Sequence, residues 1–143
     1  MTLRRLLGIE VPVVQAPMAG VQGSALAIAV SNAGGLGSLP CAMLSADAMA
    51  AELAALRAGT SKPFNVNFFC HAAPTPDERR EAVWRAQLGP YYDEFGIDAA
   101  AIPAGPGRAA FGVEAADAID AFRPAVVSFH FGLPSAGLLA RVK

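Results

Sequence analysis

Two side chains at the ends of predicted strands have types that could take part in chemistry. His130 lies between two phenylalanines in Val-Val-Ser-Phe-His-Phe, and strand alternation puts it on the same face as Ser128. An inward-facing histidine can hold an anion or move a proton near neutral pH. Asn67, in Phe-Asn-Val-Asn-Phe-Phe, carries an amide that can donate to and accept from one ligand at once.

A third candidate is the apolar turn in Val-Val-Gln-Ala-Pro-Met-Ala-Gly, residues 13–20. Ordinary surface turns favour Asn, Asp and Ser, so this composition indicates an apolar group beside the chain. From the residues alone, structural roles stay open at all three positions. The turn could cap the core, the asparagine could satisfy a loop, and the histidine could be a hydrogen-bonded core residue.

The composition argues against several classes of protein. The 143 residues are 54% hydrophobic, enough for one domain with a core, and contain no apolar run that predicts a membrane span or a signal peptide. A net charge of −1 with scattered Lys and Arg gives no basic stripe for nucleic acid. Cys41 and Cys70 are expected as free thiols, and no metal site is expected, because Cys70 and His71 are adjacent and lack ligand spacing. His71 is expected to face solvent.

Apolar patterning and turn signals predict alternating strands and helices. Strands are expected at residues 11–15, 36–39, 64–69 and 125–131, the first of them buried on both faces. Helices are expected at residues 24–32, 46–57, 76–92 and 113–122, and a last one begins at Pro134-Ser135. Ser45 and Thr75 are the expected caps of the second and third helices, with Pro76 at the first helical position and Glu78 completing a capping box. Residues 98–112, with three Gly and two Pro, predict a long loop.

Strands that alternate with helices predict an α/β fold with a parallel sheet and right-handed crossovers. A dinucleotide-binding fold is the first alternative, and it requires Gly-x-Gly-x-x-Gly after the first strand. The nearest match begins at Gly35-Leu36-Gly37, but Pro40 occupies the last glycine position. These glycines also precede a predicted strand instead of following one, which argues against that fold.

Four segments in register resemble the nitronate monooxygenases, formerly called 2-nitropropane dioxygenases. They are Pro-Val-Val-Gln-Ala-Pro-Met-Ala-Gly, Ala-Val-Ser-Asn-Ala-Gly-Gly-Leu-Gly-Ser-Leu, Phe-Asn-Val-Asn-Phe-Phe and Val-Val-Ser-Phe-His-Phe-Gly-Leu-Pro. The similarity extends over the whole chain. It implies that residues 1–143 are the first half of an FMN-binding (β/α)8 TIM barrel, truncated after about four strands, since such barrels need about 250 residues.

The resemblance also implies an activity and a set of site residues. The full-length protein would use FMN to oxidise alkyl nitronates with molecular oxygen, giving a carbonyl compound and nitrite. His130 would lie on the substrate side in a secondary role, because the family's main catalytic histidine falls outside this chain. The residues expected at the cofactor are Gln15, Ala16, Pro17, Met18 and Asn67.

The partners implied are small molecules, a nitronate and oxygen, in the cytoplasm, with no nucleic acid and no membrane. Two alternatives stay open. One is an FMN-dependent enoyl-thioester or quinone reductase built on the same barrel. The other is a noncatalytic half-barrel that associates with itself or with a missing C-terminal half, because its sheet edges are unpaired.

Overall fold

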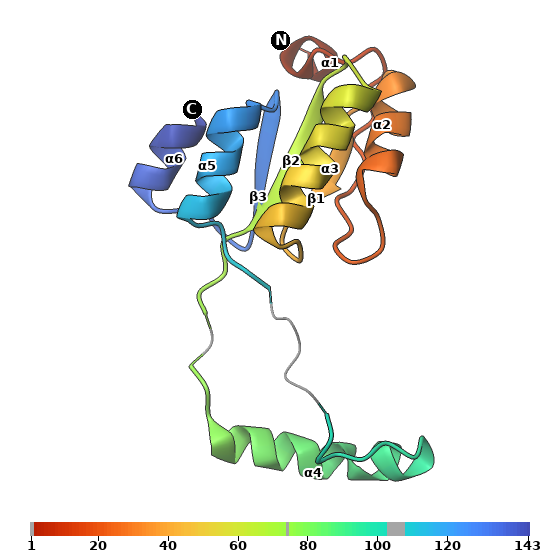
Figure 1. Cartoon of the computed structure of the whole chain (residues 1–143), viewed down its shortest axis with the longest axis vertical. Coiled ribbons are helices and arrows are strands. Elements are labelled where there is room, and N and C mark those ends of the chain that lie inside the picture. The colour runs from red at the N-terminus through yellow and green to blue at the C-terminus, as the bar shows by residue number, and fades with distance from the viewer. Residues whose placement is uncertain (1, 74, 103–107) are drawn as a thin grey trace. The chain divides into compact units, whose positions relative to one another are not determined.

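The structure is a computed structural model that describes residues 2–73, 75–102 and 108–143. It divides into two compact units, the first comprising Met1–His71 with Arg108–Lys143 and the second Ala72–Gly107. Both units are drawn in Figure 1. Among the described residues, no helix is long and apolar enough to cross a bilayer.

The first unit is built on a three-stranded parallel sheet in the order β1-β2-β3 (Figure 1). The strands are β1 (Gly37–Pro40), β2 (Phe64–Phe69) and β3 (Val126–His130). Leu39 pairs with Val66 and Val66 with Val127, so the three strands are in one continuous register. The predicted α/β fold with a parallel sheet is therefore confirmed.

The described part of this unit contains five helices: α1 (Leu3–Leu7), α2 (Ser24–Asn32), α3 (Ala46–Gly59), α5 (Val113–Phe122) and α6 (Ala136–Val142). The helices predicted over the ranges of α2, α3 and α5 are confirmed, and α6 begins just after its predicted start. Ser45 caps α3 as expected, because its Oγ accepts from the Ala48 amide at 3.2 Å. Helix α1 was not predicted, and α3 ends at Gly59, two residues past its predicted end.

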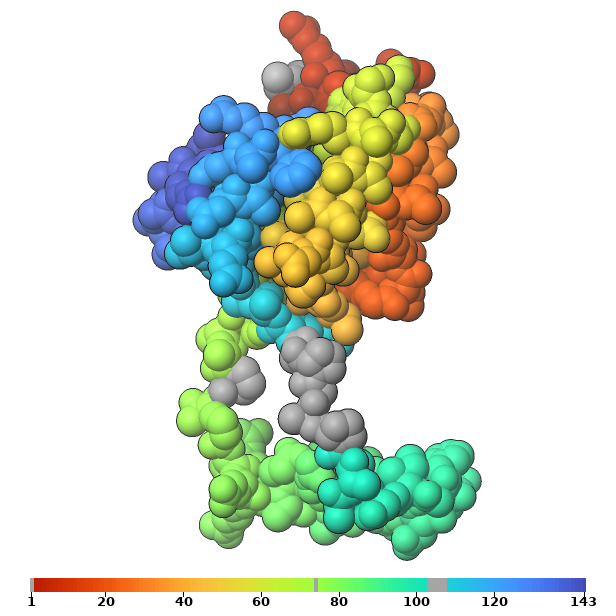
Figure 2. Space-filling model, viewed as in Figure 1, coloured from red at the N-terminus to blue at the C-terminus, as the bar shows by residue number. Residues whose placement is uncertain are grey.

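One face of the sheet carries the hydrophobic core. Leu39, Val66 and Phe68 are at most 3% exposed, and they pack against Leu53 and Leu56 of α3 and Ile119 of α5. Helices α3 and α5 also meet directly, since Arg57 donates to the Phe122 carbonyl at 2.7 Å. Figure 2 shows their side chains in one continuous surface. We call this side, with Leu39, Val66, Phe68, Val127 and Phe129, the covered face.

The close packing of α2 on β1 depends on Gly37. A Cβ at this position would lie 1.9 Å from the Ala27 carbonyl oxygen, so only glycine fits. Gly34 follows the end of α2 with a left-handed φ of 90°. This glycine segment therefore ends a helix and permits tight entry to the next strand.

The strand predicted at residues 11–15 is wrong. The segment forms only an isolated parallel bridge between Val14 and Leu36, made by the Leu36 amide to the Val13 carbonyl and the Gln15 amide to the Leu36 carbonyl. Pro12 has no N–H to extend the ladder toward the N-terminus. Val13 and Val14 are exposed instead of buried on both faces, and the sheet contains three strands instead of four.

Of the other three strand predictions, one matches the structure and two need small changes in their bounds. β2 matches its predicted range, whereas β1 begins and ends one residue late and β3 is one residue shorter at each end. β3 ends at His130 because Phe131 has a left-handed φ of 65°, which breaks extended backbone.

The second unit contains α4 (Glu78–Glu94), and its start differs from the prediction. The cap is Asp77 and not Thr75, because Asp77 Oδ1 accepts from the Arg80 amide at 3.0 Å. A carboxylate at this position also complements the helix dipole. The helix continues through Pro90 and ends at Glu94, two residues past its predicted end. Of the predicted loop at 98–112, residues 103–107 lie outside the described residues, and Ala110 forms a parallel bridge with Phe69.

Candidate functional site

The second face of the sheet is lined by polar side chains. Alternation along the strands turns the residues between the core positions to this side, and the paired register aligns Asn67 with Ser128 and Phe69 with His130. Ser38, Asn65 and Asn67 are each at most 3% exposed although they are polar. We call this side the polar face, defined by Ser38, Asn65, Asn67, Ser128 and His130.

Ser128 ties the polar face together. Its Oγ accepts from Asn65 Nδ2 and from Asn67 Nδ2, both at 2.9 Å. Asn65 Nδ2 also donates to Ser38 Oγ at 3.1 Å, so side-chain hydrogen bonds join all three strands. Because both amide NH₂ groups are engaged, Asn65 and Asn67 are held in fixed orientations.

One atom of this network lacks a partner. Asn65 Oδ1 is buried, and no hydrogen bond reaches it from any described residue. Buried polar oxygens are nearly always paired, because an unpaired one has lost its water. The polar face therefore has spare hydrogen-bonding capacity beside Asn67, at an atom that is sealed from solvent.

The apolar turn is held to β1 by two glutamines. Gln15 pairs with the Ser38 backbone, donating from Nε2 to the carbonyl at 3.2 Å and accepting at Oε1 from the amide at 3.1 Å. Gln22 donates from Nε2 to the Ser38 carbonyl at 3.0 Å and to the Ala16 carbonyl at 3.3 Å. Ala16 and Met18 remain exposed, so the turn presents an open apolar surface with a fixed backbone.

The structure thus links most of the predicted site residues through one set of contacts. Gln15 of the turn is hydrogen-bonded to the Ser38 backbone, and the Ser38 side chain is hydrogen-bonded to Asn65. Ser128 then accepts hydrogen bonds from both Asn65 and Asn67. His130 lies two residues beyond Ser128 on the same strand face. The side chain of Gln15 is occupied by β1, so any contact it makes with a cofactor uses the remaining lone pairs or its backbone.

Sequence reasoning missed several residues of this face. Gln22, Ser38 and Asn65 were not expected there, although Asn65 precedes Asn67 by two residues and so had to share its face. Gln22 carries no such periodic signal, because it lies in an irregular segment. Its role depends on how the turn folds back on β1.

His130 is exposed at the carboxyl end of β3, beside a cluster of aromatic rings. Its ring centroid lies 6.1 Å from that of Phe69 and 4.9 Å from that of Phe131. The prediction for His71 is wrong, because the residue is half-buried, its Nδ1 is shielded from solvent, and its ring lies 6.2 Å from Phe69.

The two cysteines are free thiols, as expected. Burial, with a smaller contribution from the negative charge of Glu52, raises the pKa of Cys41 to about 12. Burial also raises the pKa of Cys70, partly offset by its hydrogen bond with the Phe111 backbone. Neither thiol is activated as a nucleophile. The described ranges contain no group of three or more His, Cys, Asp or Glu side chains that could hold a metal ion.

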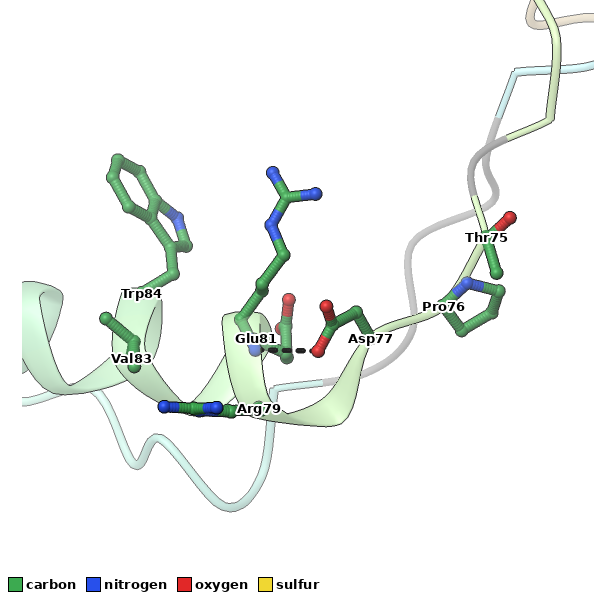
Figure 3. Close-up of a pocket in the computed structure, with 8 residues that line it drawn as sticks. Thr75, Pro76, Asp77, Arg79, Glu81, Val83 and Trp84 are labelled. Atoms are coloured by element: carbon green, nitrogen blue, oxygen red, sulfur yellow. Dashed lines mark hydrogen bonds between the residues drawn. The ribbon is translucent and has the colours of Figure 1, made fainter.

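A hollow in the second unit lies at the start of α4 and contains none of the predicted site residues. Figure 3 shows Asp77, Glu81 and Trp84 around it, with Asp77 bonded to the Arg80 backbone. Val83 and Trp84 are more than half exposed, so the hollow is an open surface along one helix. The polar face, and not this hollow, gathers the groups that could do chemistry.

A parallel sheet with helices along one face and a built polar network on the other is typical of an α/β enzyme whose site lies at the carboxyl ends of the strands. Comparison with known proteins identifies the family within this class. A family model described as nitronate monooxygenase matches residues 1–143. The chain belongs to the nitronate monooxygenase family.

Individual relatives agree with this assignment. The chain is 43% identical to a nitronate monooxygenase of Paraburkholderia phytofirmans over 146 residues, which are 96% of this chain and 38% of that protein. It is also 43% identical to a nitronate monooxygenase of Pseudomonas aeruginosa over 138 residues, 91% of this chain and 37% of that protein. The chain thus spans less than two fifths of the length of these relatives.

Solved structures extend the comparison to the fold. A nitroalkane oxidase from Streptomyces ansochromogenes superposes with a TM-score of 0.78 at 37% identity, covering 98% of this chain and 39% of that one. FabK from Thermotoga maritima superposes with a TM-score of 0.63 at 24% identity, covering 99% of this chain and 34% of that one. The second likeness concerns the fold alone.

Proposed function

We propose that a full-length protein containing this chain is an FMN-dependent nitronate monooxygenase, and that residues 1–143 supply the first half of its (β/α)8 barrel. The observation that carries the proposal is the hydrogen-bonded polar face, which is built from residues of the segments that resemble the family. In such a barrel the helices lie outside and the polar face lines the interior, so that site residues gather at the carboxyl ends of the strands. The substrates would be an alkyl nitronate and oxygen, and the setting the cytoplasm.

The residues present fit a flavin. The exposed turn at Ala16, Pro17 and Met18 offers an apolar surface for a flat ring and backbone groups for its polar edge. Asn67, fixed by Ser128, offers a directed polar contact beside it. When bound, FMN supplies the electron transfer between nitronate and oxygen. Gln15 and Gln22 contribute by holding the turn in place.

His130 is the chain's candidate for contact with the substrate. A nitronate carries its negative charge on two oxygens bound to nitrogen, and an imidazole N–H can donate to such an oxygen. The residue lies at the carboxyl end of β3 on the polar face, and its ring is exposed. It would orient the nitronate and balance its charge, the secondary role expected for it.

The proposal is tested by purifying the full-length protein and measuring its flavin absorbance, its oxygen uptake and its release of nitrite from ethyl nitronate. Noncovalent FMN with nitrite formed in proportion to nitronate consumed is the expected result. The same protein is assayed with an enoyl-thioester or a quinone and reduced nicotinamide. Reduction of those substrates without nitrite release would identify the reductase alternative, and a protein that binds no added FMN would contradict both enzyme assignments.

A further inference from the structure

We propose that His71 is a second histidine on the substrate side of this site, packed like His130 against the Phe69 ring, where it positions an anionic oxygen of the substrate. The inference deepens the proposed function and rests on it for the identity of the anion. His71 is a positioning and binding residue in this proposal and not a proton-transfer group.

The backbone places His71 on the polar face. Asn65, Asn67 and Phe69 alternate with the core residues of β2, and His71 follows two positions later. The strand pattern continues across this step, because the Cys70 amide donates to the His130 carbonyl at 2.8 Å. Alternation therefore turns the His71 side chain to the same side as Asn67 and Phe69.

The two imidazoles are arranged alike around one phenyl ring. The centroid of the Phe69 ring lies 6.2 Å from that of His71 and 6.1 Å from that of His130, with interplanar angles of 75° and 62°. Phe131 packs against the same ring at 5.0 Å. Phe69 and Phe131 thus form an apolar floor at the carboxyl ends of β2 and β3, and each histidine lies edge-on to Phe69.

One nitrogen of His71 is left for a ligand. Its Nδ1 is shielded from solvent and makes no hydrogen bond with any described residue, so a bound molecule does not reach the ring there. Nε2 is not among the shielded atoms of the described residues, and it can donate to a ligand while the ring packs on Phe69. A small anion above the Phe69 floor could accept from both histidines. The chemistry that fits is a pair of oxygens on one planar group, as in a nitronate or in nitrite.

The competing explanation is that His71 only packs on Phe69. His71→Phe separates the two, because it keeps an aromatic ring against Phe69 and removes both nitrogens. In the full-length holoprotein we expect this variant to raise the KM for ethyl nitronate about tenfold or more, the loss expected for one hydrogen bond to a charged group. FMN content and melting temperature should stay close to those of the parent protein.

Nitrite binding, measured by calorimetry, provides a readout that does not depend on turnover. Its Kd should rise by a similar factor in His71→Phe, and His71→Gln, which restores an N–H donor, should recover part of the loss. Tyr91→Phe, a polar-to-apolar change at an exposed aromatic residue of α4, is the matched control and should leave both values unchanged.

Unchanged KM and unchanged nitrite affinity in His71→Phe would overturn the proposal, and so would a loss confined to FMN content. If His71→Phe does not fold, His71→Gln alone provides the test. A lower melting temperature than that of the parent protein, with no change in nitrite affinity, would assign His71 to packing. Failure of the parent protein to release nitrite from nitronate would instead refute the proposed function, while the nitrite titration would still test His71.

Discussion

The two faces of the sheet use the same strands for different purposes. On the covered face, Leu39, Val66 and Phe68 are sealed under α3 and α5 by apolar contacts alone. On the polar face, Ser38, Asn65 and Asn67 are buried to the same extent, but directed hydrogen bonds hold them. Burial therefore does not separate core from site in this molecule. The distinction lies in whether the buried atoms have spare polar capacity.

The largest effect should come from a cavity under the covered face. Leu53 is fully buried in α3, so Leu53→Ala should lower the free energy of unfolding by about 2–5 kcal/mol. Urea unfolding of the full-length protein measures the loss. The exposed Leu133 serves as the matched control, and Leu133→Ala should change stability by less than about 0.5 kcal/mol. Equal effects of the two substitutions would show that α3 does not seal this face.

A smaller stability effect is expected at the centre of the polar face. Ser128→Ala removes the acceptor shared by Asn65 and Asn67, and each of the two lost hydrogen bonds should cost about 0.5–1.5 kcal/mol. Asn65 Nδ2 then keeps only Ser38 Oγ, and Asn67 Nδ2 keeps only the Ser128 carbonyl at 3.3 Å. The substitution should also weaken FMN retention in the full-length protein, because Asn67 loses its fixed orientation. Ser61→Ala, at an exposed serine, is the control. A stability loss with unchanged flavin affinity would make the network structural only.

The two cysteines should react with iodoacetamide at different rates. The Cys41 thiol is buried and has a pKa of about 12, so at pH 8 it stays protonated. It should therefore resist iodoacetamide in the folded protein. Cys70 is only partly buried, although its pKa is also raised, and should react first. Peptide mass spectrometry of timed samples distinguishes the sites, and denatured protein should label at both. Faster labelling of Cys41 would mean that the covered face opens readily.

The sequence predicted the fold better than the site because the two depend on different information. Periodicity and turn residues located β2, α2 and α5, since these elements are specified by local patterns. The segment at 11–15 was mispredicted because its apolar run indicates a buried strand. Whether such a segment is buried depends on neighbouring strands, which the run itself does not specify. The cap at Asp77 was missed because Thr75 also satisfies the local capping pattern.

The site required contacts between distant residues. Asn67 and His130 could be identified from their place at strand ends, and the resemblance assigned them roles. The hydrogen bonds of Ser128 to Asn65 and Asn67 depend on the register of β2 and β3, which no local pattern specifies. Gln22 likewise gains its role only when the chain folds back and brings it to Ser38.

The central claim is that the polar face serves the chemistry and the covered face serves stability, and the adjacent residues Phe129 and His130 test it most directly. Their side chains leave one strand on opposite faces, Phe129 packing on Phe111 at 5.1 Å and His130 lying exposed beside Phe69. The measurement is kcat/KM with ethyl nitronate and the melting temperature of each variant in the full-length holoprotein.

The account predicts opposite results for the two substitutions. His130→Asn should lower kcat/KM about tenfold or more, with FMN content and melting temperature nearly unchanged. Phe129→Ala should lower stability by up to about 3 kcal/mol and leave kcat/KM within about twofold at temperatures where the protein is folded. Normal turnover in a destabilised His130→Asn protein would contradict the account and return His130 to a structural role.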